Sequence, residues 1–128
     1  MDEKKYLGID WGEARIGLAL GDNVLRIATP HKVVANLAEV LDEIKNEDID
    51  EIVLGHPRSL GEGEERFHKD YIAFSEELKK VTDRKVNSFD ERLSSKAADA
   101  LIGDRKTKAP RDAVAAMVIL QSYLDSIS

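Results

Sequence analysis

Three acidic residues stand where the sequence is otherwise apolar or where a predicted element begins or ends. Asp10 lies within the apolar segment GIDWG, Glu91 follows the end of a predicted strand in SFDER, and Asp112 falls in the first turn of an apolar predicted helix, DAVAAMVIL. A buried carboxylate is unfavourable by several kcal/mol unless it is paired, binds a metal or opens to a cleft. The three acids are therefore the candidate catalytic and metal-binding residues.

Carboxylates that converge at the ends of neighbouring strands and a helix repel one another and favour a bound cation. Hard oxygen ligands suit Mg²⁺ or Mn²⁺, and two such ions about 3.5–4 Å apart would position a water and stabilise the leaving oxygen of a phosphodiester. Two of the acids also have an ordinary interpretation: Asp112 would favour the helix dipole in any protein, and Glu91 could pair with Arg92 or face solvent. The set of three predicts one or two divalent ions and phosphodiester hydrolysis.

Basic residues lie close in sequence to these acids. Arg15 follows the first predicted turn and Arg92 follows the second acid, so either could contact a scissile phosphate or pair with a neighbouring carboxylate. Lys106, Lys108 and Arg111 lead to the third acid and could follow the backbone of RNA or DNA, or form an ordinary solvated loop. These five cations are the candidate nucleic-acid-binding residues.

Other residues near Asp10 have two interpretations each. Trp11 either packs in the core or stacks on a nucleobase. Gly8, Gly12 and Gly17 let backbone or ligand approach closely, although the sterics of a hairpin would explain them as well. The three histidines show no metal-ligand spacing with one another, and we do not include them in the catalytic set.

Hydrophobic spacing and turn residues predict one α/β domain over residues 1–128. The first three predicted strands form an antiparallel meander, and the later ones join them in a mixed sheet through crossovers. Pro30 limits the third strand to edge pairing, and Pro110 favours the first position of the last helix. Strands are predicted over Lys5–Trp11, Arg15–Leu20, Val24–Val34, Glu51–Gly55 and Lys85–Phe89. One helix is predicted to begin after an Asn36 cap, and a second carries a buried stripe from Phe67 to Val81. Two more helices are predicted over Ser94–Ile102 and Pro110–Tyr123.

Composition narrows the class of protein. The chain has 128 residues and no cysteine, which excludes disulfide scaffolds, thiolate metal sites and a cysteine nucleophile. The longest apolar run is far shorter than the roughly 20 residues of a membrane span, so we expect a cytoplasmic protein without membrane contact. A net charge of −6 means that nucleic-acid binding would need a locally basic face.

Four segments in order resemble the motifs of the YqgF family, a family of Holliday junction resolvase-like proteins and nucleases that process the 5′ end of precursor 16S ribosomal RNA. The segments are YLGIDWGEARIGLAL, IVLGHP, FDERLSS and RDAVAAMVIL, and the resemblance extends from Tyr6 to about Leu124. The resemblance implies an RNase H-like fold with a five-stranded mixed sheet flanked by helices. It also implies that Asp10, Glu91 and Asp112 are the metal-binding catalytic acids.

The function that follows is a metal-dependent endonuclease acting on structured RNA or branched DNA. Processing of the 5′ end of pre-16S rRNA, in contact with ribosomal precursor particles, is the leading interpretation, and resolution of Holliday junctions in DNA is the alternative. Junction resolution calls for two active sites, whereas RNA processing works in a monomer, so we expect a monomer or a weak homodimer. Two further alternatives remain: a nucleotide-binding lobe of the actin and sugar-kinase type, which the first hairpin also resembles, and a non-catalytic nucleic-acid-binding module.

Overall fold

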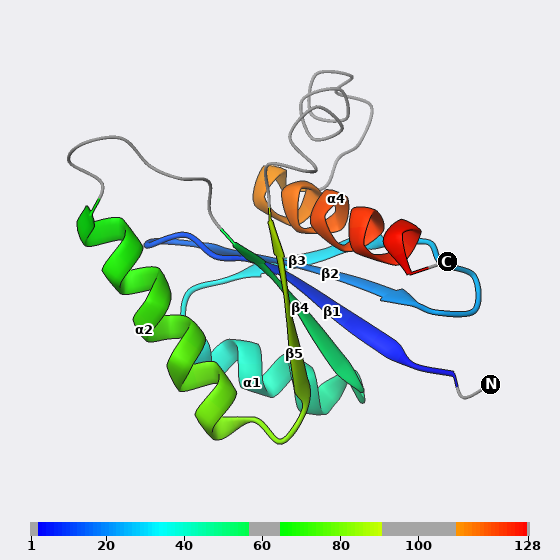
Figure 1. The fold of residues 1–128 in the computed structure, drawn as a ribbon, viewed down its shortest axis with the longest axis horizontal. Helices are drawn as coiled ribbons and strands as arrows, with labels where there is room; N and C mark the ends of the chain where they lie inside the picture. Colours follow the sequence, from blue (N-terminus) through cyan, green and yellow to red (C-terminus); the bar gives the residue numbers. More distant parts are fainter. Residues whose placement is uncertain (1–2, 57–64, 91–109, 128) are drawn as a thin grey trace.

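The computed structural model describes residues 3–56, 65–90 and 110–127. Within these ranges the chain forms a five-stranded sheet with helices on both faces (Figure 1). The strands are β1 (Lys5–Asp10), β2 (Ile16–Asp22), β3 (Thr29–Val34), β4 (Glu51–His56) and β5 (Lys85–Asp90), and the helices are α1 (Leu37–Asn46), α2 (Glu65–Val81) and α4 (Arg111–Ser126). The helix expected over Ser94–Ile102 lies outside the described residues. None of the described helices combines the length and the apolar composition needed to cross a bilayer.

The strand order β3-β2-β1-β4-β5 confirms the predicted mixed sheet. β1, β2 and β3 form an antiparallel meander, while β4 pairs in parallel with β1 and with β5. The carboxyl ends of β1, β4 and β5 therefore lie at one end of the sheet. In the β1–β2 ladder, Asp10 at that end lies opposite Gly17, and Lys5 at the other end lies opposite Asp22.

Two hydrophobic clusters cover the two faces of the sheet. On one face, side chains of α1 and α2 pack against Leu7 and Ile9 of β1. On the other face, α4 packs against Tyr6 of β1 and Val53 of β4. Figure 1 shows α1 and α2 on one side of the strands and α4 on the other. Alternation along β1 thus assigns Tyr6, Gly8 and Asp10 to the α4 face.

Local sequence signals explain several element boundaries. The Asn36 side chain accepts a hydrogen bond from the Glu39 N–H at 3.0 Å, which confirms the predicted cap of α1. Pro30 lies in β3, an edge strand, where its missing N–H disrupts no interior ladder. Pro110 is the N-cap of α4 rather than its first helical residue, so the helix begins at Arg111, one residue later than predicted. Along α2, Tyr71 and Leu78 are buried as predicted, whereas Val81 at the helix end is 47% exposed and does not belong to the buried stripe.

The expectation of an extended strand from Val24 was wrong, because β3 begins only at Thr29. The Asp22 carboxylate accepts hydrogen bonds from the N–H groups of Val24 and Leu25, which turns the chain just after β2. Arg26 then adopts a left-handed conformation with φ of 56°. Apolar character in this segment marks exposed loop side chains rather than a strand.

Candidate active site

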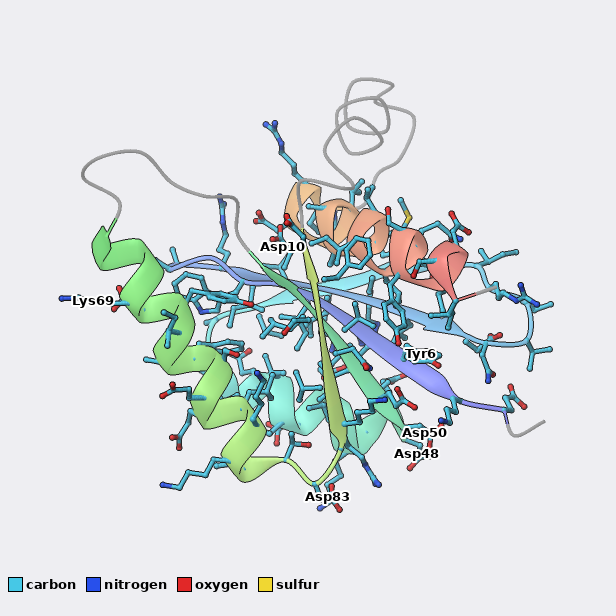
Figure 2. The ribbon with its side chains drawn as sticks, in the orientation of Figure 1. Tyr6, Asp10, Asp48, Asp50, Lys69 and Asp83 are labelled. Carbon is cyan, nitrogen blue, oxygen red and sulfur yellow. The ribbon has the colours of Figure 1, made fainter. Side chains whose placement is uncertain are left out.

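Asp10 ends β1 with its side chain on the α4 face of the sheet. The neighbouring residues on that face are tightly covered: a Cβ on Gly8 would lie 2.8 Å from Cβ of Leu120 in α4. Asp10 itself is half-buried, at the end of the ladder where the cover by α4 begins. Figure 2 shows it beside the first turn of α4. The hydrophobic strand thus carries one carboxylate to a partly open position at the end of the sheet.

Gly17 brings the second acid to the same place. It pairs with Asp10 in the ladder, and its missing side chain leaves room for the backbone of Asp112 and Ala113 to rest on the strand. A Cβ on Gly17 would overlap the Asp112 carbonyl group and would lie 3.0 Å from the Ala113 nitrogen. The first turn of α4 is therefore seated directly across from Asp10. Asp112 is half-buried, with a side chain that is 35% exposed.

The glycines near Asp10 do not all serve one purpose. Gly8 and Gly17 lie beneath α4, so their role is the close approach of a helix rather than of a ligand. A Cβ on Gly12 would lie 2.8 Å from the carbonyl oxygen of Arg15, which is the hairpin constraint that the sequence predicted. The sequence left open whether backbone or ligand approaches these glycines, and the position of α4 decides this for Gly8 and Gly17.

Arg15 forms an ion pair with one of the acids. Its Nε lies 3.2 Å from Oδ2 of Asp112, and the Arg15 side chain is 73% exposed. An ion pair this open to solvent contributes at most about 1 kcal/mol to stability. Of the two interpretations of Arg15, the pair with a carboxylate is present in the structure, and the exposed guanidinium remains accessible to a phosphate.

Of the other predicted site residues, the structure describes only Arg111. Arg111 is the first residue of α4 and is exposed, next to Asp112 in sequence. Glu91, Arg92, Lys106 and Lys108 lie outside the described residues. Glu91 comes two positions after Phe89, whose ring packs edge-on against Tyr123 of α4 at 6.3 Å between centroids.

Trp11 belongs to the core rather than to an exposed stacking surface. Its ring lies 6.0 Å from that of Tyr71 and 6.2 Å from that of Phe74, both on α2. These contacts lie on the face opposite α4, where Trp11 is partly buried against the α1–α2 cluster. Asp10 and Trp11 are adjacent in sequence, so this packing anchors the chain immediately after the carboxylate.

A second group of potential ligands lies on the opposite face, which sequence spacing did not reveal. Oxygen and nitrogen atoms of His31, Glu43 and Glu47 lie within 4.8 Å of one another. The Glu43 carboxylate is 2.7 Å from Nε2 of His31 and 3.1 Å from Nζ of Lys32, and Glu47 is 3.1 Å from Nζ of Lys5. The hydrogen bond from His31 holds the pKa of Glu43 below its usual value, with Lys32 adding to the effect against the opposing effect of burial. Protein cations already compensate these carboxylates, so the group explains β3–α1 packing without a metal.

The Asp10–Asp112 end of the sheet is the other candidate cation site. Asp112 is also paired with a protein cation, Arg15, but that pair is open to solvent, whereas the Glu43 carboxylate is only 10% exposed in its pairs with His31 and Lys32. The Asp10 and Asp112 carboxylates are half-buried and offer hard oxygen ligands. Their backbones are held together by strand pairing and by the Gly17 contact. We therefore treat this end of the sheet as the candidate active site.

Comparisons with known proteins show the family that the chain resembles. A family model described as "RuvX: Holliday junction resolvase" matches residues 4–126. A protein of Anaeromyxobacter sp. (strain Fw109-5) named "Putative pre-16S rRNA nuclease" is 39% identical over 132 residues, covering 94% of this chain and 96% of the relative. One of the same name from Maridesulfovibrio salexigens is 38% identical over 132 residues, covering 94% and 97%. These matches confirm the resemblance inferred from the motifs.

Solved structures show the same fold. A chain described as T. thermophilus RuvC in complex with Holliday junction substrate aligns with a TM-score of 0.69 at 12% identity, covering 97% of this chain and 95% of that one. A fowlpox virus resolvase in complex with Holliday junction DNA aligns with a TM-score of 0.60 at 13% identity, covering 96% and 98%. Likeness at such low identity concerns the fold, and it confirms the expected RNase H-like architecture.

Proposed function

The chain belongs to the RuvX family, and we propose that it is a metal-dependent endonuclease whose active site is the Asp10–Asp112 end of the sheet. Family membership makes it a nuclease, a hydrolase acting on phosphodiester bonds. One observation carries the assignment of the site. The first turn of α4 rests on Gly17, which brings Asp112 across from Asp10.

Asp10, Asp112 and Glu91 are the proposed ligands of one or two Mg²⁺ or Mn²⁺ ions. Such ions supply Lewis-acid stabilisation of the negative charge that develops at the phosphate during hydrolysis. The protein contributes rigidity: Asp10 is held by the β1–β2 ladder and Asp112 by the helix start packed on it. Glu91 is proposed as the third ligand because it directly follows β5, whose carboxyl end lies at the same end of the sheet.

Cations near the acids are the proposed contacts to nucleic acid. Arg15 is held by Asp112 yet exposed, so it can meet a phosphate without a change of position. Arg92, Lys106, Lys108 and Arg111 are proposed to contact the substrate backbone. Replacing Lys106, Lys108 and Arg111 together by alanine should weaken binding and flatten its dependence on salt, because fewer counterions are released. A salt dependence equal to that of the wild type would place the substrate on another face.

The proposed substrate is precursor 16S ribosomal RNA, cleaved at its 5′ end on ribosomal precursor particles. Support comes from relatives of matching length, 38–39% identical, that are named pre-16S rRNA nucleases. The test is cleavage of labelled RNA spanning that end, in Mg²⁺ and in Mn²⁺, by wild type and by Asp10→Asn. Cleavage by the wild type alone supports the proposal. Cleavage by both proteins, or by neither, contradicts it.

Holliday junction resolution is the second candidate, because the matching family is described by that activity. A four-way junction is cut symmetrically by two active sites, so this activity predicts a dimer on the junction. The same assay, run with a labelled four-way DNA junction and with single strands, separates the candidates. Paired, symmetric incisions in the junction with intact RNA would favour the resolvase.

A further inference from the structure

A loop at the end of the sheet away from the candidate active site presents three aliphatic side chains to solvent. Val24 is 62% exposed, Leu25 71% and Ile27 60%. The loop follows Asp22, which pairs with Lys5 at the opposite end of the ladder from Asp10. Figure 1 shows this β2–β3 connection beside the C-terminal end of α4. Leu25 and Ile27 line one hollow, and aliphatic side chains gathered on the surface of a folded domain can mark an interaction surface.

The loop is held in one shape rather than left loose. The side-chain amide of Gln121 in α4 donates to the carbonyl oxygen of Arg26 at 2.9 Å and accepts from the N–H of Ala28 at 2.8 Å. At the other end of the loop, the Asp22 carboxylate binds two N–H groups. These bonds retain Arg26 in a left-handed conformation, which is unfavourable for a residue with a side chain. Such preorganisation lowers the entropy lost when a partner binds.

Carboxylates surround the aliphatic side chains. An open hollow of about 470 Å³ beside the loop is lined by Leu25 and Ile27 and also by Glu3, Asp22 and Lys5. Lys5 forms an ion pair with Glu47, so its charge is compensated. Asp125, which accepts a hydrogen bond from Gln121 at 3.1 Å, adds a carboxylate on the helix side of the loop. Arg26 is the cation on the loop itself. Lys4, whose backbone binds Asn23 of the loop, directs its Nζ to Glu51 at 2.7 Å, so the surroundings are acidic on balance.

We propose that this loop surface, formed by Val24, Leu25, Ile27, Glu3, Asp22 and Asp125, docks a protein segment that combines apolar side chains with lysine or arginine. The apolar residues of the partner would cover the aliphatic side chains, and its cations would face the surrounding carboxylates. The surface is remote from Asp10, so the proposal does not depend on the nuclease function.

Charge and area favour this partner over others. The three loop residues expose only on the order of 300 Å², well below the roughly 800 Å² per partner of a stable dimer. A symmetric second copy would also bring carboxylates against carboxylates. Nucleic acid and anionic lipid are disfavoured by the same negative charge, and aliphatic side chains offer no ring on which a base could stack.

The test uses the full-length, ¹⁵N-labelled protein and two synthetic amphipathic peptides. One peptide is built of leucine and lysine, and the other carries glutamate in place of each lysine. The basic peptide should shift the amide signals of residues 22–28 and of Gln121, and the acidic peptide should not. Signal changes centred on Asp10 or α2, equal binding of both peptides, or no binding of the basic peptide would overturn the proposal.

Variants make the test specific to the loop. Leu25→Ser with Ile27→Ser should weaken binding of the basic peptide roughly tenfold or more, because interfaces depend on a few buried apolar side chains. The matched control is Ile72→Ser with Val81→Ser, which changes two exposed apolar residues on α2 and should leave binding unchanged. Equal losses in the two double variants would overturn the proposal. The proposal would also be overturned if the wild type dimerises in sedimentation, or binds phosphatidylglycerol vesicles, and the loop variant does not.

Discussion

Gly17→Ala should impair the candidate active site while leaving the fold intact. The new Cβ would overlap the carbonyl group of Asp112 and would lie 3.0 Å from the nitrogen of Ala113. Favourable non-bonded contacts lie at about 3.5–4.0 Å, and a helical backbone cannot rotate out of the way as a side chain does. The start of α4, and Asp112 with it, must therefore move by on the order of 1 Å.

A displacement of that size has different consequences for stability and for activity. Overpacking of a buried contact costs about 1–3 kcal/mol, which a domain with a typical stability of about 5–15 kcal/mol tolerates. Misplacement of a catalytic group by about 1 Å lowers a rate by about 10²-fold. We therefore expect kcat/KM for metal-dependent cleavage to fall about a hundredfold, with a cooperative thermal transition retained.

Gly21→Ala is the matched control, since it lies on the same strand beneath the same helix. Its Cβ would lie 3.1 Å from Cδ1 of Leu124 and 3.2 Å from Cδ2 of Leu120, the ends of side chains that can adjust. It would also lie 3.2 Å from the carbonyl oxygen of Ile27, a tight contact but not the overlap that a Cβ on Gly17 would make. Gly21 is also far along β2 from Asp10. Cleavage should therefore be nearly unchanged in this variant. Equal activity in the two variants, or loss of the thermal transition in Gly17→Ala, would refute the reasoning.

Three further variants test individual contacts. Arg15→Ala should change the free energy of unfolding by less than about 1 kcal/mol, because its ion pair with Asp112 is exposed, yet lower kcat/KM; unchanged kinetics would remove it from the site. Glu43→Gln should lower stability at pH 7 by about 1.5–3 kcal/mol, as measured by urea unfolding. The hydrogen bond from His31 lowers the pKa of Glu43, so the contribution of this carboxylate to stability is present above the carboxyl pKa of the unfolded chain and is lost as pH falls through the lowered value. The free energy of unfolding of the variant should therefore fall less steeply at acidic pH than that of the wild type. Parallel pH profiles of stability would contradict this. Asn36→Ala removes the side-chain cap of α1 and should cost about 1 kcal/mol in the same unfolding assay, whereas no change would mean that solvent replaces the cap.

Much of the fold was predictable because local chemistry and long-range structure agree. The apolar run of β1 and the cap at Asn36 act within a few residues, and the structure confirms both the strand and the cap. The prediction of a strand over Val24 to Ile27 was wrong, since apolar content alone does not separate a strand from a turn. That turn depends on Asp22 nearby in sequence and on Gln121, which is 95 residues from Arg26.

The candidate site was likewise predictable from the sequence only in part. Asp10 was singled out by its apolar neighbours and Asp112 by its place in the first turn of an apolar predicted helix, and the motifs added that both belong to one site. The reason for their proximity was not readable, because the contact between Gly17 and the start of α4 joins segments nearly a hundred residues apart. The pairing of His31 with Glu43 was likewise invisible, since one lies on a strand and the other on a helix.

The most direct test of the central claim is a calorimetric titration of Mn²⁺ into the wild type, Asp10→Asn, Asp112→Asn and Glu47→Gln. Glu47 belongs to the potential ligand group on the opposite face and serves as the control. If the metal centre lies at the Asp10–Asp112 end of the sheet, the first two variants lose binding and Glu47→Gln retains the wild-type affinity. Binding that survives in both aspartate variants and is lost in Glu47→Gln would contradict the account.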